Sequence, residues 1–524
     1  MALVEAPNAR ALVHATPAED LYFLVTEVGI EDSLELVQLA SPAQFRTFVD
    51  LAGWKRDQLD SHALLTWLRA ARGDDPEDFL RKVAKLDLEL LEILLRELTV
   101  IYDLEEDPDA NPDGVTLEMP EGKYLIEFKV EGVEQFTLRT LINDLIAQNP
   151  FEAGRLVEAI RWELPSELQE AAYQFRAARL SELGFPELEV AMRLFSYVSP
   201  ASVTKPQEHP LSTSGALAPG TSGVDYLKAA LDGLKPDEQN ALESELRYLI
   251  NAALVAEAAE PGDMDAVRGV SERSRDYLLL GLEYLTSADP LLASQVVRDL
   301  TTQRIFQVGF SLTLELKFRA DRLLRRPLSH LGGQPWVLEP ERTALAALRR
   351  KRPLKALKVE GAEPVPFRTL RELAAARAIL DCVEAQLALF AVLLGPTAEE
   401  GALVLRRFEG LSSPLTPELL LRAAVAHAVL DGNVWVAPLP PQRLVALGEA
   451  LFEGTAPAPL IRHAARAQLH RTLLAPIRPE LAQAVQRVLD ASLEVLKVEL
   501  GTVFLSHHGF GPEVAEILPV MTTP

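Results

Sequence analysis

Histidines are the residues of this chain whose chemistry would be easiest to recognise, because an imidazole can bind a metal ion or move a proton near neutral pH. His463 and His470 are seven residues apart, which places them on one helix face two turns apart. No carboxylate at ligand spacing completes a zinc site with them. His507 and His508 are adjacent, and neighbouring side chains on a helix point in different directions. We therefore expect no metal and no cofactor at these histidines.

The chain also lacks the short motifs that mark common catalytic sites. It contains no His-Glu-x-x-His zinc helix, no phosphate loop, no nucleophile elbow and no strand-linked Gly-x-Gly-x-x-Gly. The single cysteine, Cys382, lies in the helical sequence 378–383, which is typical of a buried small residue rather than a reactive thiol. The sequence therefore offers no catalytic residue, and an enzyme is the less favoured interpretation.

Acidic residues gather between Asp74 and Glu121, where sixteen Asp and Glu stand against four Lys and Arg. The run from Asp103 to Asp109 has the composition of a calcium loop. It lacks the Asp-x-Asp-x-Asp-Gly spacing and the closing Glu of such a loop. A solvated acidic corner is the favoured interpretation.

The opposite charge gathers between Lys317 and Lys358, where twelve Lys and Arg stand against three acids. Two interpretations stay open: a solvated helix face that offsets acidic surface elsewhere, or a dock for an acidic partner or a phosphorylated ligand. Nucleic acid is disfavoured, because aromatic residues for base stacking are few here and the net charge of the chain is −24. The candidate partner-binding residues are Arg325, Arg326, Arg349, Arg350, Lys351 and Arg352.

Proline recurs at the first position of successive predicted helices, which indicates that the candidate residues lie in a helical protein. Four starts share one formula, in which a capping side chain, a proline and an acidic or amide residue follow in order: Thr16-Pro17-Ala18-Glu19, Ser41-Pro42-Ala43-Gln44, Asp75-Pro76-Glu77-Asp78 and Asn149-Pro150-Phe151-Glu152. Leucine-rich sequence follows each start, and only 6% of residues are aromatic, which favours helices over sheets. The pattern predicts a mainly α fold of stacked short helices, an irregular helical repeat or solenoid.

One segment departs from the helical period. Between residues 114 and 131, Tyr124, Ile126 and Phe128 alternate with other residues after a turn at 120–123. A period of two predicts strands, so we expect one β-hairpin inserted among the helices.

The composition changes again between residues 200 and 223, where Pro, Ser, Thr and Gly dominate without apolar periodicity. Such a stretch is typical of a linker. We therefore expect an N-terminal helical domain over 1–199, which carries the hairpin, and a C-terminal helical domain over 224–524.

The longest strongly apolar stretch, residues 387–394, has only eight residues, whereas a membrane span needs about twenty. The first ten residues lack the basic start and apolar core of a signal peptide. We expect no membrane span and a cytoplasmic location.

Several runs resemble a bacterial family that is catalogued only as a domain of unknown function. They are Pro17 to Gly29, Leu39 to Gln44 with Trp54, Arg179 to Phe185, and Phe306 to Lys317, and the likeness extends over most of the chain in order. More distantly, the first helices are similar to the helical-repeat N-terminal domain of bacterial magnesium transporters, a regulatory module. These resemblances imply a helical fold type, no known catalytic residue and nothing about magnesium.

Together these features favour a non-catalytic helical scaffold that binds another protein along a surface of successive helices. The alternative is an enzyme or a ligand-regulated module with a site at the junction of the two halves, near 200–223.

Overall fold

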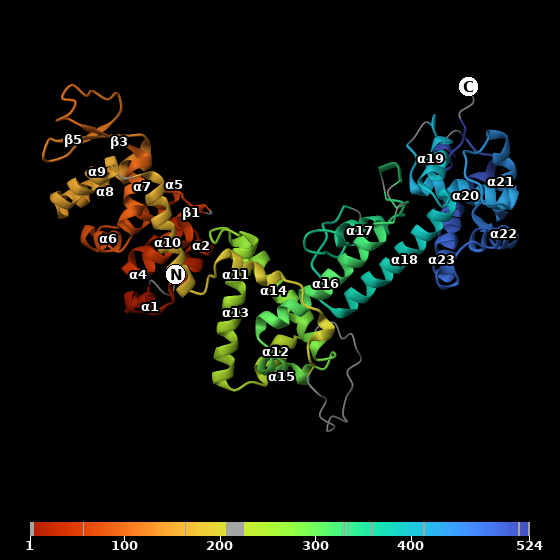
Figure 1. Cartoon of the computed structure of the whole chain (residues 1–524), viewed down its shortest axis with the longest axis horizontal. Helices are drawn as coiled ribbons and strands as arrows, with labels where there is room; N and C mark the ends of the chain where they lie inside the picture. Colours follow the sequence, from red (N-terminus) through yellow and green to blue (C-terminus); the bar gives the residue numbers. More distant parts are fainter. Residues whose placement is uncertain are drawn as a thin grey trace. The chain divides into compact units, whose positions relative to one another are not determined.

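The computed structural model describes residues 5–521 except 56, 163, 206–224, 327, 330, 334, 358, 360, 412–413 and 512–513. Contacts divide the chain into two compact units (Figure 1). The first unit comprises Met1–Ser196, Leu234–Arg275 and Thr301–Gln303, and the second comprises Tyr197–Gly233, Asp276–Leu300 and Arg304–Pro524. The described residues are mainly helical, which confirms the predicted fold class.

The first unit consists of helices, one three-stranded sheet and one short strand pair. Its helices are α1 (Ala9–Ala15), α2 (Ala18–Val28), α3 (Leu34–Leu39), α4 (Pro42–Ala52), α5 (Ser61–Arg72), α6 (Pro76–Val83), α7 (Leu88–Leu98), α8 (Gly132–Gln148), α9 (Pro150–Trp162), α10 (Pro165–Glu182), α11 (Leu188–Met192), α13 (Pro236–Glu257) and the start of α14 (Met264–Leu285). Its strands are β1 (Trp54–Lys55), β2 (Gln58–Leu59), β3 (Thr99–Asp103), β4 (Thr116–Glu118) and β5 (Tyr124–Phe128).

The second unit contains the remainder of α14 and most of α16 (Thr302–Leu324). Its other helices are α12 (Tyr226–Asp232), α15 (Ala293–Asp299), α17 (Glu341–Leu348), α18 (Leu370–Leu394), α19 (Ala398–Arg406), α20 (Pro417–Asp431), α21 (Leu444–Leu451), α22 (His463–Leu474), α23 (Pro479–Leu496), α24 (Thr502–His507) and α25 (Val514–Ile517). Strands β6 (Phe452–Thr455) and β7 (Ala458–Ile461) form a hairpin, and a π-helix over Lys497–Gly501 follows α23.

A helix begins at each of the four proline motifs, as predicted, and the predicted side-chain cap is confirmed at three of them. Ser41 and Gln44 form a capping box at α4, in which each side chain bonds the backbone N–H of the other residue. Asp75 accepts bonds from two first-turn N–H groups of α6, and Asn149 accepts one from α9. The cap predicted at Thr16 is wrong: its hydroxyl donates back to the carbonyl of Leu12 in α1, so it is not available to α2.

The predicted hairpin is present as the antiparallel pair β4 and β5. Strand β5 also pairs with β3, from Thr99 opposite Phe128 to Asp103 opposite Tyr124, so the element is a three-stranded sheet with the order β3-β5-β4. The two short pairs β1-β2 and β6-β7 were not predicted either. The prediction of a solvated acidic corner is wrong at Asp103, because its side chain is only 6% exposed and pairs with Arg161.

Among the described residues of the second unit, two hydrophobic clusters stand out. One contains side chains of α14, α16, α17 and the first part of α18, and the other contains the end of α18 and helices α19 to α25. Leu387 belongs to the first cluster, and its near neighbour Phe390 belongs to the second. Helix α18 is therefore the element that both clusters share.

The predicted linker at 200–223 lies mostly outside the described residues, and the domain boundaries stay a prediction. Its first residues form a short 3₁₀ turn over Pro200–Ser202. Within the part of the chain that the structure covers, no single helix has the length and apolar composition of a membrane span. Helices α18 and α19 satisfy that test only as a pair, and they meet at a bend of 74°.

Candidate functional site

The structure brings two parts of the basic segment together beside the end of α16. Arg349 Nε bonds Asp321 Oδ1 at 2.9 Å, and Lys317 Nζ donates to the backbone carbonyl of Arg350 at 3.0 Å. Arg325 directly follows α16, and its backbone N–H bonds the carbonyl of Asp321 at 3.1 Å. Because Asp321 also bonds Arg349, Arg325 and residues 349–351 lie at the same end of α16.

The six candidate residues differ in how their charges are compensated. Arg326 pairs with Glu384 at 2.7 Å, and Arg350 comes no closer than 3.8 Å to the exposed Glu363. Arg352 is half-buried and has an interaction partner. Arg325 and Lys351 are exposed, and within the described part of the chain neither side chain forms an ion pair.

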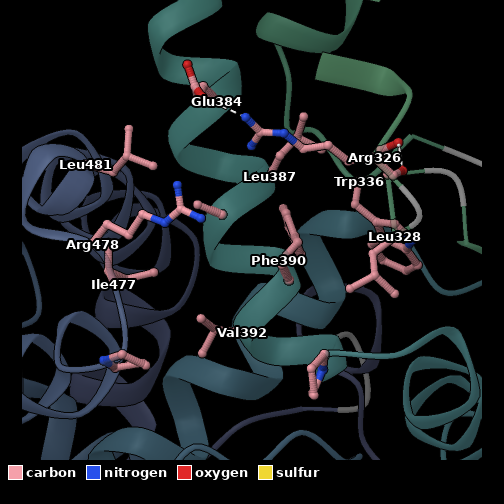
Figure 2. Close-up of a pocket in the computed structure, with 15 residues that line it drawn as sticks. Arg326, Leu328, Trp336, Glu384, Leu387, Phe390, Val392, Ile477, Arg478 and Leu481 are labelled. Carbon is pink, nitrogen blue, oxygen red and sulfur yellow. Dashed lines mark hydrogen bonds and ion pairs between the residues drawn. The ribbon is translucent and has the colours of Figure 1, made fainter. Parts of the chain in front are cut away.

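Arg326, one of these six candidate residues, also lines a cavity of about 480 Å³ in the second unit (Figure 2). The cavity is bounded by the chain that follows α16, by α18, and by the connection between α22 and α23. Its side chains come from Arg326, Leu328, Ser329, Trp336, Glu384, Leu387, Ala388, Phe390, Ala391, Val392, Pro396, Pro476, Ile477, Arg478 and Leu481.

The floor of the cavity is apolar and firmly held. Trp336 is 1% exposed, its Nε1 donates to the carbonyl of Leu331 at 2.8 Å, and its ring lies 5.7 Å from that of Phe390. The hydroxyl of Ser329 is also occupied, because it donates to the carbonyls of Leu324 and Arg326. A buried indole with a satisfied N–H is a stable wall rather than a mobile one.

Among the described residues, two arginines and one glutamate line the cavity, so one positive charge is not balanced within it. Glu384 accepts bonds from Arg326 and, at 3.3 Å, from Arg319, which also bonds Asp381 at 2.6 Å. Arg478 is exposed and forms no ion pair with any described residue. Figure 2 shows Arg326 and Arg478 reaching toward α18 from opposite sides.

Sequence reasoning missed Arg478 because it lies far along the chain from the basic segment. A local signal was nevertheless present in Pro476-Ile477-Arg478-Pro479. A residue before proline is restricted to extended backbone, and Arg478 has φ −60° and ψ 140° directly before α23 begins at Pro479. The motif therefore fixes the backbone from which this arginine projects.

A second cavity, of about 500 Å³, lies on another face of α18 and includes Cys382. Burial raises the pKa of the Cys382 thiol to about 11, and the Glu341 carboxylate acts in the same direction. Gln386 is buried and bonds both Glu341 Oε2, at 3.1 Å, and the backbone N–H of Leu338. Among the described residues, no group of three or more His, Cys, Asp and Glu is placed to hold a metal ion.

The raised pKa predicts slow alkylation of Cys382. At pH 8 the thiolate fraction falls about 100-fold relative to a thiol with the ordinary value, and the thiolate is the reacting form. We expect iodoacetamide to modify the folded chain about 100-fold more slowly than the urea-unfolded chain, as followed by intact mass. Because the chain has one cysteine, the mass change reports on this residue alone. Equal rates in the two states would contradict the assignment.

Comparison with protein families gives one match. The model of a family of unknown function, DUF6178, matches residues 1–518. The chain belongs to this family. No curated protein and no solved structure matches the chain. Family membership covers nearly the whole chain, including both units and the cavity, and it assigns no role to any residue.

Proposed function

We propose that this DUF6178 protein is a non-catalytic helical module of a bacterial cytosol that binds an acidic partner protein. Arg325, Arg326, Arg349, Arg350, Lys351 and Arg352 form the binding surface. The observation that carries the proposal is the exposure of Arg325 and Lys351 without an ion pair among the described residues. On a chain with a net charge of −24, such cations are complementary to an acidic surface of another protein.

The cavity beside this surface also supports binding over chemistry. Its one hydroxyl, that of Ser329, is bonded to two carbonyls, and its one carboxylate, that of Glu384, is bonded to arginines. A nucleophilic hydroxyl needs a neighbouring base to accept its proton, and a backbone carbonyl is not such a base; a general base needs a carboxylate that is not held by cations. The distant likeness to the magnesium-transporter domain adds only a fold type to the proposal.

Charge reversal tests the surface. We expect replacement of Arg349, Arg350, Lys351 and Arg352 by glutamate to weaken partner binding more than tenfold, since like charges across an interface cost several kcal/mol. The measurement is a pulldown from the native host, followed by titration of the captured protein at rising salt. Binding by the unmodified chain should fall with salt, because exposed charges are screened beyond about 8 Å at physiological ionic strength.

The matched control reverses four exposed arginines of the first unit: Arg139, Arg155, Arg193 and Arg247. It carries the same change of charge and should bind the partner as the unmodified chain does. If the 349–352 variant binds normally but melts at a lower temperature, the segment is an internal brace, of which the Arg349–Asp321 pair is one contact.

A further inference from the structure

We infer that the cavity between Arg326 and Arg478 binds a small organic anion with an apolar body. Arg326 borders both this cavity and the proposed partner-binding surface, but the two proposals are tested separately, because the substitutions below change the interior of the cavity and leave residues 349–352 intact. A volume of about 480 Å³ lies within the range of about 300–1,000 Å³ that is usual for small-molecule sites.

The apolar body is indicated by the floor. The buried side chains of Trp336, Leu387 and Phe390, each at most 5% exposed, form the rigid backing of the cavity. The carbon that a ligand can reach comes from partly exposed aliphatic side chains, which include Leu328, Val392 and Leu481. Ala388 and Ala391 leave room that longer side chains would fill. A flat or branched apolar group in this space would exchange contact with water for contact with aliphatic carbon.

The anionic group is indicated by Arg478. Its guanidinium carries five N–H donors, and it forms no ion pair within the described residues. Arg326 also lines the cavity, and among the described residues its guanidinium makes a single side-chain bond, to Glu384, which leaves further donors. A carboxylate, sulfonate or phosphate can accept two parallel bonds from a guanidinium. The prolines on either side of Ile477 and Arg478 hold the backbone, so that little backbone conformational freedom is lost on binding.

The experiment titrates the full chain with 8-anilinonaphthalene-1-sulfonate, an aromatic anion, and with N-phenyl-1-naphthylamine, which lacks the sulfonate. Fluorescence should show saturable binding of the anion and at least tenfold weaker binding of the neutral analogue. Arg478→Glu should weaken binding of the anion about tenfold, since hydrogen bonds to charged groups are the stronger ones, and leave binding of the neutral analogue unchanged.

Arg471→Glu is the matched control, because Arg471 is exposed on α22, outside the cavity, and its guanidinium bonds Gln468 and no carboxylate among the described residues. It should bind the anion as the unmodified chain does. Ala391→Trp should abolish binding of both probes by filling the cavity, and Ala388→Leu serves if the larger side chain lowers the melting temperature. The inference is overturned if Arg478→Glu and Arg471→Glu bind the anion equally, or if the filled cavity binds it as before.

Discussion

Replacement of Gly309 by alanine is expected to lower the free energy of unfolding by more than about 3 kcal/mol, beyond the usual cost of overpacking. A Cβ atom at this position would lie 1.8 Å from the backbone carbonyl oxygen of Tyr277. Backbone cannot move aside as a flexible side chain can, so α14 and α16 would have to separate. Urea unfolding followed by circular dichroism measures the loss.

The contact between α14 and α16 is reciprocal, because each helix places a glycine against the backbone of the other. Gly281 of α14 faces Ile305 of α16, where a Cβ would meet the carbonyl oxygen at 2.0 Å. Tyr277 and Gly281 are four positions apart, as are Ile305 and Gly309, so each helix offers one glycine and one larger residue a turn apart. The Tyr277 ring also packs edge-on against Phe306 and Phe310, at 5.3 Å from each. Separating the helices would undo these ring contacts as well.

Gly154 in α9 is the matched control. Apart from its chain neighbours and the backbone of its own helix, no described atom lies within 4 Å of a Cβ placed there, and the residue is inside a helix. Gly154→Ala should therefore follow helix propensity and raise the free energy of unfolding by up to about 1 kcal/mol. The two substitutions have opposite expected signs, although both put alanine in place of a helical glycine. If Gly309→Ala also stabilises, the close approach of α14 and α16 is wrong.

Helical propensity alone would have predicted stabilisation at both glycines, and this shows where sequence reasoning ends. The run from Phe306 to Lys317 carried part of the family resemblance, but its pattern gave no reason for the glycine within it. That reason is a contact with a helix about thirty residues earlier in the chain. Local signals succeeded where the structure is local, as at the capping box of Ser41 and Gln44.

The same difference between local signals and long-range contacts holds for the sheet and for the cavity. Alternation revealed β5, whereas β3 follows the leucine stripe of α7 without a break and is defined by pairing with residues more than twenty positions away. In the cavity, the cluster around Arg326 was visible as local charge density. Arg478 was not, because it belongs to a connection between helices about 150 residues further along and meets the cavity only through packing of α18 with α23.

The second large effect is expected at Arg179, in another run that carried the family resemblance. Its guanidinium makes two bonds to Asp50, at 2.7 and 2.8 Å, and two to Asp87, at 3.0 and 2.6 Å. The Asp50 side chain is only 2% exposed. Removing one partner of a buried ion pair typically costs about 3–5 kcal/mol, because it leaves the other charge buried without compensation. Arg179→Met should lower the free energy of unfolding by that amount.

Two further variants separate lost charge from lost packing. Arg155→Met removes an exposed arginine that bonds Glu152 at 3.4 Å, and it should change stability by less than about 0.5 kcal/mol. Asp50→Leu combined with Arg179→Met removes the more buried carboxylate together with its arginine and should recover part of the loss, since apolar replacement of paired buried charges is often neutral. Asp87, the second partner of Arg179, keeps its charge, but its side chain is 16% exposed. A double variant no more stable than Arg179→Met would show that packing, and not the isolated carboxylate, sets the cost.

The pH dependence gives an independent test of the same carboxylate. Burial raises the pKa of Asp50, and the bonds from Arg179 act against that rise. Without Arg179 the pKa should rise further above its unfolded value, so the folded state binds more protons between the two values. Stability of the variant then increases as the pH falls through that window. We therefore expect the difference in unfolding free energy between Arg179→Met and the unmodified chain to be smaller at pH 5 than at pH 7. A difference independent of pH would mean that Asp50 is not the group left uncompensated.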